Sequence, residues 1–67
     1  MPAFDKTKSY TITAYYPNGK IMRDNYGEFN FLTLWNITKK NDVYIGYDEQ
    51  KRERRFNSRL TIEYFEF

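Results

Sequence analysis

The most regular pattern in the chain is the alternation of side chains over residues 7–16. Tyr10, Ile12 and Ala14 lie on one side of this segment, with threonines between them. A period of two in a segment rich in Thr and Tyr is typical of a half-buried strand. Pro17-Asn18-Gly19 then has the composition of a turn, so residues 20–26 are expected to return as the second strand of a hairpin. Its charged side chains and poor alternation predict an edge strand.

Residues 29–41, with the sequence FNFLTLWNITKKN, have a different pattern. If Asn30 is the N-cap, four residues fall at the i, i+3, i+4 and i+7 positions of one helical stripe, namely Phe31, Leu34, Trp35 and Thr38. The pattern predicts a helix over about residues 31–40, with Lys39 and Lys40 at its C-terminal end and Asn41 as its stop. The odd-numbered residues from Phe29 to Ile37 also alternate, so a strand is the competing interpretation.

Beyond this segment, residues 43–47 alternate, residues 48–51 have the composition of a turn, and residues 52–56 form a charged return strand. Asn57-Ser58 is a second break, and residues 59–67 alternate again. The predicted fold is a single small α+β domain over residues 1–67, with the order β-β-α-β-β-β and residues 1–6 as a loose lead-in. A mainly antiparallel sheet would then carry the helix on one face. The alternative is a small all-β barrel.

Composition limits how such a domain can be stabilised. A chain of 67 residues buries only about 60% of its unfolded surface, and this one has neither cysteine for disulfides nor histidine for a structural zinc site. It does have seven Tyr, six Phe and one Trp. Each large ring can bury about 150–250 Å². We therefore expect an aromatic core, with Trp35 largely buried between the helix and the sheet.

Alternation also predicts a candidate contact surface. The layer that faces the helix is expected to hold Tyr10, Ile12, Ala14, Val43, Ile45, Leu60 and Ile62 against Phe31, Leu34 and Trp35. Tyr15, Tyr44, Phe65 and Phe67 would lie on the opposite face of the sheet. An exposed aromatic patch of this kind often marks a contact surface. Alternatively, the N-terminal arm or the curling of the sheet covers these rings.

The net charge lies in one segment. The chain has eleven basic and nine acidic residues, and the excess of +2 falls within residues 48–59, which contain Lys51, Arg52, Arg54, Arg55 and Arg59. Arginines on a strand can bind phosphates, but domains that bind nucleic acid usually carry a larger basic excess. Arginine with Tyr, Phe and Trp is equally typical of protein interfaces. A solvated hairpin without a partner is the third interpretation.

The chain offers little for catalysis. Without histidine and cysteine it cannot build the common nucleophilic triads, and it contains no phosphate-binding glycine motif and no carboxylate spacing of a metal site. We predict a protein that is not an enzyme and that uses no cofactor or metal. There is no apolar run of membrane-spanning length and no signal sequence, and the lack of cysteine fits a reducing compartment, so a cytoplasmic location is expected.

These observations favour a small adaptor or inhibitor that contacts a larger protein through an aromatic and arginine surface, and the arginines would suit a partner with an acidic surface. The predicted contact residues are Tyr15, Tyr44, Phe65, Phe67, Lys51, Arg52, Arg54, Arg55 and Arg59. The second hypothesis is binding of single-stranded nucleic acid through the open sheet face and the basic hairpin over residues 51–59. A weaker third hypothesis is a homo-oligomeric structural module, such as a homodimer.

Overall fold

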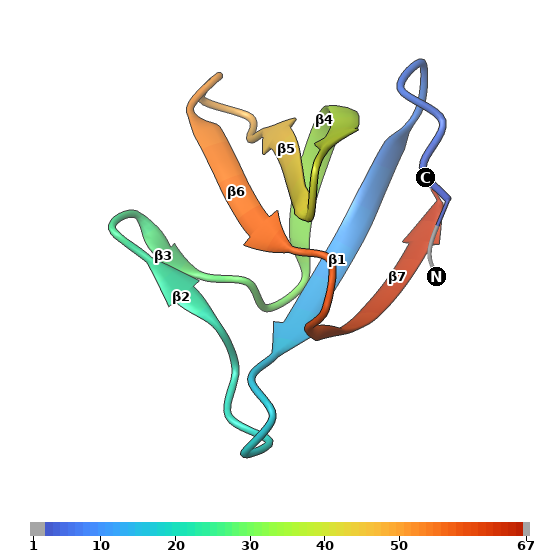
Figure 1. Ribbon diagram of the computed structural model, residues 1–67. Coiled ribbons are helices and arrows are strands. Elements are labelled where there is room, and N and C mark those ends of the chain that lie inside the picture. Colours follow the sequence, from blue (N-terminus) through green and yellow to red (C-terminus); the bar gives the residue numbers. More distant parts are fainter. Residues whose placement is uncertain (1–2, 67) are drawn as a thin grey trace.

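The computed structural model describes residues 3–66, and in this part of the chain every regular element is a strand (Figure 1). The strands are β1 (Ser9–Tyr15), β2 (Arg23–Asp24), β3 (Gly27–Glu28), β4 (Leu32–Lys40), β5 (Val43–Tyr47), β6 (Glu53–Asn57) and β7 (Thr61–Glu66). Five of them form an antiparallel sheet in the order β6-β5-β4-β1-β7, and β2 pairs with β3 in a separate two-stranded sheet. The α+β prediction is therefore wrong, and the all-β alternative describes the secondary structure.

The five-stranded sheet is strongly bent, so that β5 and β6 stand on one side of the interior and β7 on the other (Figure 1). The ring of Phe4 lies in this interior. Its centroid is 6.2 Å from that of Phe56 on β6 and 5.0 Å from that of Tyr64 on β7, the two strands at opposite ends of the sheet order. The sheet thus curls around a shared core, although the described pairing does not join β6 to β7 as a closed barrel would require.

The predicted helix over residues 31–40 is a strand, β4, that pairs on both sides. Three of the residues from Thr33 to Thr38 are β-branched, and β1 and β5 offer hydrogen bonds at either edge. Helical spacing alone could not outweigh two sheet partners. Asn41 does have a left-handed backbone with φ 57°, but it turns the chain from β4 into β5 instead of ending a helix.

A β-bulge interrupts β4. The register shifts between Trp35 and Thr38, and Asn36 within this shift has φ 54°. The extra residue brings Leu34 and Ile37 to the same buried face although they are three positions apart in sequence. The predicted helical stripe instead grouped Leu34 with Phe31, Trp35 and Thr38, and of these four residues the structure buries Leu34 alone.

Trp35 was expected in the core and is not there. It is 39% exposed on the outer side of β4, whereas its neighbour Leu34 is fully buried. Phe31, also assigned to the core, is 69% exposed. These two corrections move large rings from the interior to the surface.

The faces of β5 are also opposite to the prediction. Tyr44 is buried, stacked on Phe56 with 5.2 Å between ring centroids, while Val43 and Ile45 are only partly buried. A tyrosine ring buries more apolar area than valine or isoleucine, which favours this orientation. Gly46 then also points inward, where a Cβ atom would lie 3.0 Å from Cγ1 of Ile37 and 3.2 Å from Cβ of Leu34.

The core contains buried residues from β1, β4, β5 and β6 together with Phe29, which precedes β4. They are Tyr10, Ile12, Ala14, Phe29, Leu34, Ile37, Tyr44 and Phe56, with Phe4, Met22, Leu32, Leu60 and Ile62 packed against them. The face of β1 predicted from alternation is confirmed. Phe4 contributes ring contacts with Tyr10 and Tyr44 at 5.0 Å each, so the N-terminal segment takes part in the core.

The segment between β1 and β4 forms an arm. Its first turn follows the sequence prediction, because the amide of Gly19 donates to the carbonyl of Tyr16 across Pro17 and Asn18. The expected strand over residues 20–26 is limited to β2 and an isolated bridge between Tyr15 and Ile21. The arm then continues through the short β2–β3 hairpin, which lies beside β6 in Figure 1.

Candidate protein-binding surface

The outer face of the sheet, turned away from the core, carries four large exposed rings. They are Phe31, which is 69% exposed, Phe65 at 54%, Trp35 at 39% and Tyr47 at 38%. We call these four residues the aromatic surface. Trp35 and Tyr47 are cross-strand partners in the β4–β5 pair, and the rings of Phe31 and Phe65 are 6.5 Å apart. The aromatic surface therefore spans β4, β5 and β7.

Threonines lie between these rings. The register aligns Thr33 with Thr11 and Thr11 with Phe65 in one row across three strands. The hydroxyls of Thr11 and Thr33 are 3.2 Å apart, and both Thr11 and Thr13 are buried although they belong to the outer face. These side chains are small and β-branched, which suits a strand, and the four larger rings lie among them.

Phe31 is held in an unusual backbone conformation. Its φ is 51°, a left-handed value that bulky residues rarely adopt and that costs about 1–2 kcal/mol. Its amide donates to the hydroxyl of Thr13 at 3.0 Å, which fixes the backbone at this point. The fold thus accepts strain at a position where the ring gains little burial.

Tyr15 and Phe65 lie on the outer face, as the alternation predicts. Phe65 belongs to the aromatic surface, whereas Tyr15 is partly buried and its hydroxyl donates to Glu63 at 3.2 Å. That hydrogen bond, with some burial and the nearby negative charge of Glu63, raises the pKa of Tyr15. The placement of Tyr44 on this face is wrong, because Tyr44 is a core residue. Phe67 lies outside the described residues.

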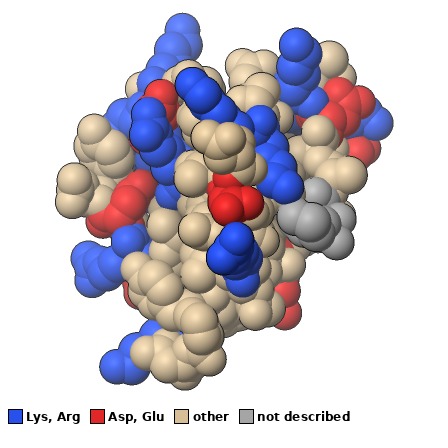
Figure 2. Space-filling model, in the orientation of Figure 1, with Lys and Arg blue, Asp and Glu red and all other residues tan. Residues whose placement is uncertain are grey.

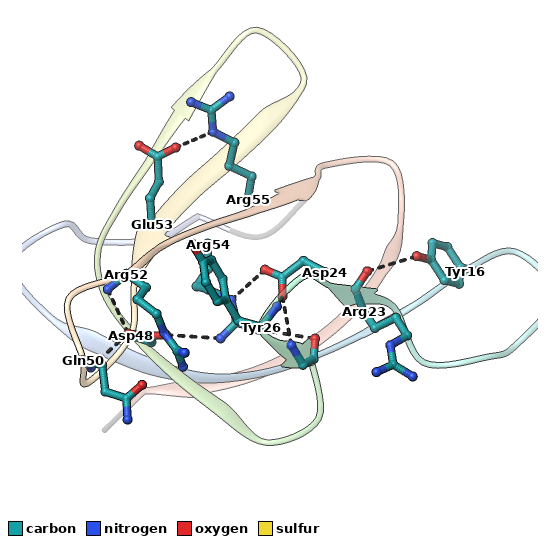
Figure 3. Close-up of polar contacts among 11 residues, drawn as sticks. Tyr16, Arg23, Asp24, Tyr26, Asp48, Gln50, Arg52, Glu53, Arg54 and Arg55 are labelled. Atoms are coloured by element: carbon teal, nitrogen blue, oxygen red, sulfur yellow. Dashed lines mark hydrogen bonds and ion pairs between the residues drawn. The ribbon is translucent and has the colours of Figure 1, made fainter.

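Arg54 is the largest departure from the predicted basic surface. Its side chain is only 2% exposed. Figure 3 shows its guanidinium between two carboxylates: Nε donates to Oδ2 of Asp24 at 2.6 Å, and Nη1 donates to Oδ2 of Asp48 at 3.2 Å. Because its donors are committed to these partners inside the protein, Arg54 is not available to an external partner.

Asp48 organises the turn between β5 and β6. Its carboxylate accepts hydrogen bonds from the amides of Gln50 and Arg52 and from Nε of Arg52, each at 2.9 Å. Burial opposes ionisation of this carboxyl group, but the hydrogen bonds from Arg52, Arg54 and Gln50 outweigh it and lower its pKa from 3.8 to about 2. The charged form of Asp48 is therefore part of the folded structure.

Asp24 has the same role in the arm. Its carboxylate accepts hydrogen bonds from the amides of Tyr26 and Gly27 as well as from Arg54. Burial again opposes ionisation, and Arg54 with the two amides outweighs it, so the pKa of Asp24 is lowered. The ring of Tyr26 also lies 4.6 Å from the guanidinium of Arg52 and 5.6 Å from that of Arg54. These contacts fasten the β2–β3 hairpin to β6.

The other predicted basic residues remain at the surface. Lys51 is exposed, and the side chains of Arg55 and Arg59 are 64% and 80% exposed. Arg55 pairs with Glu53 at 2.6 Å and Arg59 with Asp42 at 3.3 Å. On the face drawn in Figure 2, basic side chains are scattered with acidic ones between them. Burial thus removes Arg54 from the predicted basic surface, and Arg55 and Arg59 each have an acidic partner.

Sequence reasoning missed Phe31, Trp35 and Tyr47 as surface residues. The alternation of Phe31, Thr33 and Trp35 was the available signal for the first two of these residues. It places them on one face if the segment is a strand, but the segment was interpreted as a helix. Tyr47 was missed for another reason: it shares a face of β5 with Val43 and Ile45, and the alternation assigned that face to the core. The outer face therefore carries different exposed rings from those expected, with Phe31, Trp35 and Tyr47 added and Tyr44 removed.

The described part of the chain, residues 3–66, contains no cluster of three potential metal-ligating side chains. No helix within it is long and apolar enough to cross a membrane. No known family, curated protein sequence or solved structure is similar to this chain. The functional argument therefore rests on the geometry of the aromatic surface and its surroundings.

Proposed function

We propose that this protein is a non-enzymatic binding module that acts as a small adaptor or inhibitor by contacting a larger protein through the aromatic surface. The observation that carries the proposal is the concentration of Phe31, Trp35, Tyr47 and Phe65 on one face, each between 38% and 69% exposed. Large aromatic side chains are enriched at the centres of protein interfaces. The absence of cysteine fits a cytoplasmic site of action.

The strain at Phe31 supports the same proposal. A left-handed backbone at a phenylalanine lowers stability, and an exposed ring recovers little of that cost through burial. Asparagine or glycine would fit this position with less strain. A phenylalanine here is easier to explain if its ring contacts a partner.

The test is affinity capture from cell lysate, with the wild-type protein compared with matched variants and captured proteins identified by mass spectrometry. The test variant carries both Phe31→Asn and Trp35→Thr. These substitutions remove two rings and introduce an asparagine, which suits a left-handed backbone, and a threonine, which suits a strand. The control, Tyr16→Ala, removes a ring that is 38% exposed near the Pro17 turn and outside the aromatic surface. We expect at least one protein to be captured by the wild type and the control and lost by the test variant. Equal capture by all three proteins would contradict the proposal.

Binding of single-stranded nucleic acid is the second candidate. Arg55 favours it, because its exposed side chain lies on the outer face, opposite Ile45 in the β5–β6 pair. Arg55 also follows closely in sequence on the turn that begins after Tyr47. Exposed rings can stack on bases while arginine binds phosphate. The burial of Arg54 and the pairing of Arg55 with Glu53 weaken this candidate.

Salt dependence separates the two candidates. If Lys51, Arg55 and Arg59 contact phosphates, the affinity for an oligonucleotide should fall with salt, each contact adding about 0.7 to the log–log slope. Fluorescence anisotropy with a labelled single strand at low and moderate salt measures this. Tight, salt-sensitive binding that Arg55→Ala weakens would favour the nucleic-acid candidate over the protein partner.

A further inference from the structure

Two rings of the aromatic surface border one hollow in the outer face. Trp35 on β4 and Tyr47 on β5 are direct cross-strand partners, and both rings are more than a third exposed. The hollow has a volume of about 750 Å³ and is lined by Trp35, Asn36, Tyr47, Asp48, Glu49 and Lys51. A volume of this size is typical of a binding site for a small ligand or a short segment of a larger one.

The bulge in β4 adds a polar side chain to this hollow. Trp35 and Asn36 are consecutive, yet both are exposed, because the register shift at this point interrupts the alternation of the strand. The indole N–H of Trp35, the amide of Asn36 and the hydroxyl of Tyr47 are hydrogen-bond donors. Within residues 3–66, none of these three side chains has a hydrogen-bond partner in the protein. The hollow therefore combines two rings with three available donors.

The backbone beside the hollow offers a ligand no free strand edge. Trp35 pairs with Ser9 on one side and with Tyr47 on the other, and Tyr47 pairs with Trp35 and with Glu53. A ligand here must therefore be bound by side chains and cannot extend the sheet. An ordinary extended peptide pressed against the rings would bury backbone N–H groups without acceptors, which is unfavourable.

A proline-rich segment avoids this penalty. Proline has no backbone N–H, and the polyproline II helix has no internal hydrogen bonds, so its carbonyl groups remain free to accept. The donors of Trp35, Asn36 and Tyr47 are the groups that such carbonyls require. Polyproline II segments also dock in grooves lined by aromatic rings, and because the helix is already formed before binding, little entropy is lost.

The charges around the hollow favour a neutral ligand. Asp48 is already neutralised by ion pairs with Arg52 and Arg54. The other two charged residues, Glu49 and Lys51, are exposed and opposite in sign. A quaternary ammonium group is another ligand that aromatic rings bind, but Lys51 would repel it at the same hollow.

We propose that the hollow bordered by Trp35 and Tyr47 binds a proline-rich segment of the partner protein in the polyproline II conformation. Proline rings pack on Trp35 and Tyr47, and backbone carbonyl groups accept hydrogen bonds from the three donors. This inference rests on the proposed function and names the segment that the partner presents. Phe31 does not line this hollow, so it contacts a different part of the partner.

The fluorescence of Trp35 provides a direct test, because it is the only tryptophan in the chain. The protein is titrated with decaproline that is acetylated and amidated at its ends, and separately with a Gly-Ser peptide of the same length and the same end groups. We expect a saturable blue shift of the emission with decaproline and none with the Gly-Ser peptide. No saturable change with decaproline, or an equal change with both peptides, would overturn the proposal.

Three variants locate the site and keep Trp35 as the reporter. Tyr47→Thr removes one ring and should weaken decaproline binding about tenfold or more. Asn36→Asp replaces the amide donors with acceptors at a left-handed position that aspartate tolerates, and should weaken binding about two- to tenfold. Phe31→Asn, outside the hollow, should bind decaproline as the wild type does. Circular dichroism and thermal unfolding verify that each variant is folded.

Equal affinity of Tyr47→Thr and the wild type for decaproline would also overturn the proposal, since the peptide would then bind elsewhere. Affinity capture from lysate distinguishes this failure from failure of the proposed function. If decaproline does not bind at the hollow while capture still depends on Phe31 and Trp35, the proposed function stands and the partner presents a folded surface.

Discussion

Arg54 on β6 and Asp24 on β2 form a two-point ion pair, in which Nε donates to Oδ2 at 2.6 Å and Nη2 donates to Oδ1 at 2.9 Å. The pair joins residues thirty positions apart and holds the β2–β3 hairpin against the five-stranded sheet. Asp48 contacts the same guanidinium from the β5–β6 turn. A single buried arginine thus connects the arm, the edge strand β6 and the β5–β6 turn.

Removal of Arg54 should be strongly destabilising. Arg54→Ala leaves Asp24 and Asp48 without their shared cation, and loss of one partner from a buried ion pair costs about 3–5 kcal/mol. Arg54→Lys should recover only part of this, because an ammonium group cannot bind Asp24 at two points. Urea unfolding measures the free energy, and Arg55→Ala, which removes an exposed arginine, is the control with an expected change below about 1 kcal/mol. Equal costs for Arg54→Ala and Arg55→Ala would contradict the structural role of Arg54.

Stability should fall in acid because of Asp48. Its pKa in the folded protein is about 2, below the ordinary value of 3.8, so its stabilising contribution is complete above about pH 4 and is lost as the pH falls towards 2. Asp24, whose pKa is also lowered, adds to the same trend. Urea unfolding between pH 2 and pH 7 measures the change. Asp48→Asn should be less stable than the wild type at neutral pH and should lose less stability between pH 4 and pH 2. The same acid dependence in both proteins would show that other carboxyl groups cause it.

Gly46 should not tolerate a side chain. A Cβ atom at this position would lie 3.0 Å from Ile37 and 3.2 Å from Leu34, two core residues that the bulge in β4 brings together. We expect Gly46→Ala to cost about 1–3 kcal/mol by overpacking, with a larger loss for Gly46→Val. Thermal unfolding of the two variants beside the wild type gives the order. Stability equal to the wild type in Gly46→Ala would mean that β5 can move away from β4 at no cost.

The sequence predicted those parts of the fold in which the alternation is regular. The face of β1 that holds Tyr10, Ile12 and Ala14 was identified correctly because no bulge interrupts that strand. In β4 the helical stripe of Phe31, Leu34, Trp35 and Thr38 was taken as the buried face, whereas the bulge at Asn36 brings Leu34 and Ile37 to that face. A local pattern cannot reveal a bulge, since the bulge depends on how the neighbouring strands pair.

The candidate site shows the same limit for charge. Arg54 and Arg55 are adjacent and chemically identical, yet one is buried and the other is exposed. The difference comes from Asp24, which only the tertiary structure brings to Arg54. Composition therefore predicted an aromatic and arginine surface, while the fold decided which rings and which arginines belong to it.

Phe29 and Phe31 provide the sharpest separation of stability from binding. Phe29 is fully buried and its ring is 5.7 Å from that of Phe56, so Phe29→Ala should cost about 3–5 kcal/mol. Phe31, two positions later, is 69% exposed with φ 51°, so Phe31→Asn removes little burial and relieves backbone strain. We expect Phe31→Asn to leave the free energy of unfolding unchanged or raise it by up to about 1 kcal/mol, while abolishing partner capture. Urea unfolding and affinity capture on the same preparations compare the two variants. A loss of several kcal/mol in Phe31→Asn would show that this ring stabilises the fold, and its exposure would then have no bearing on a partner.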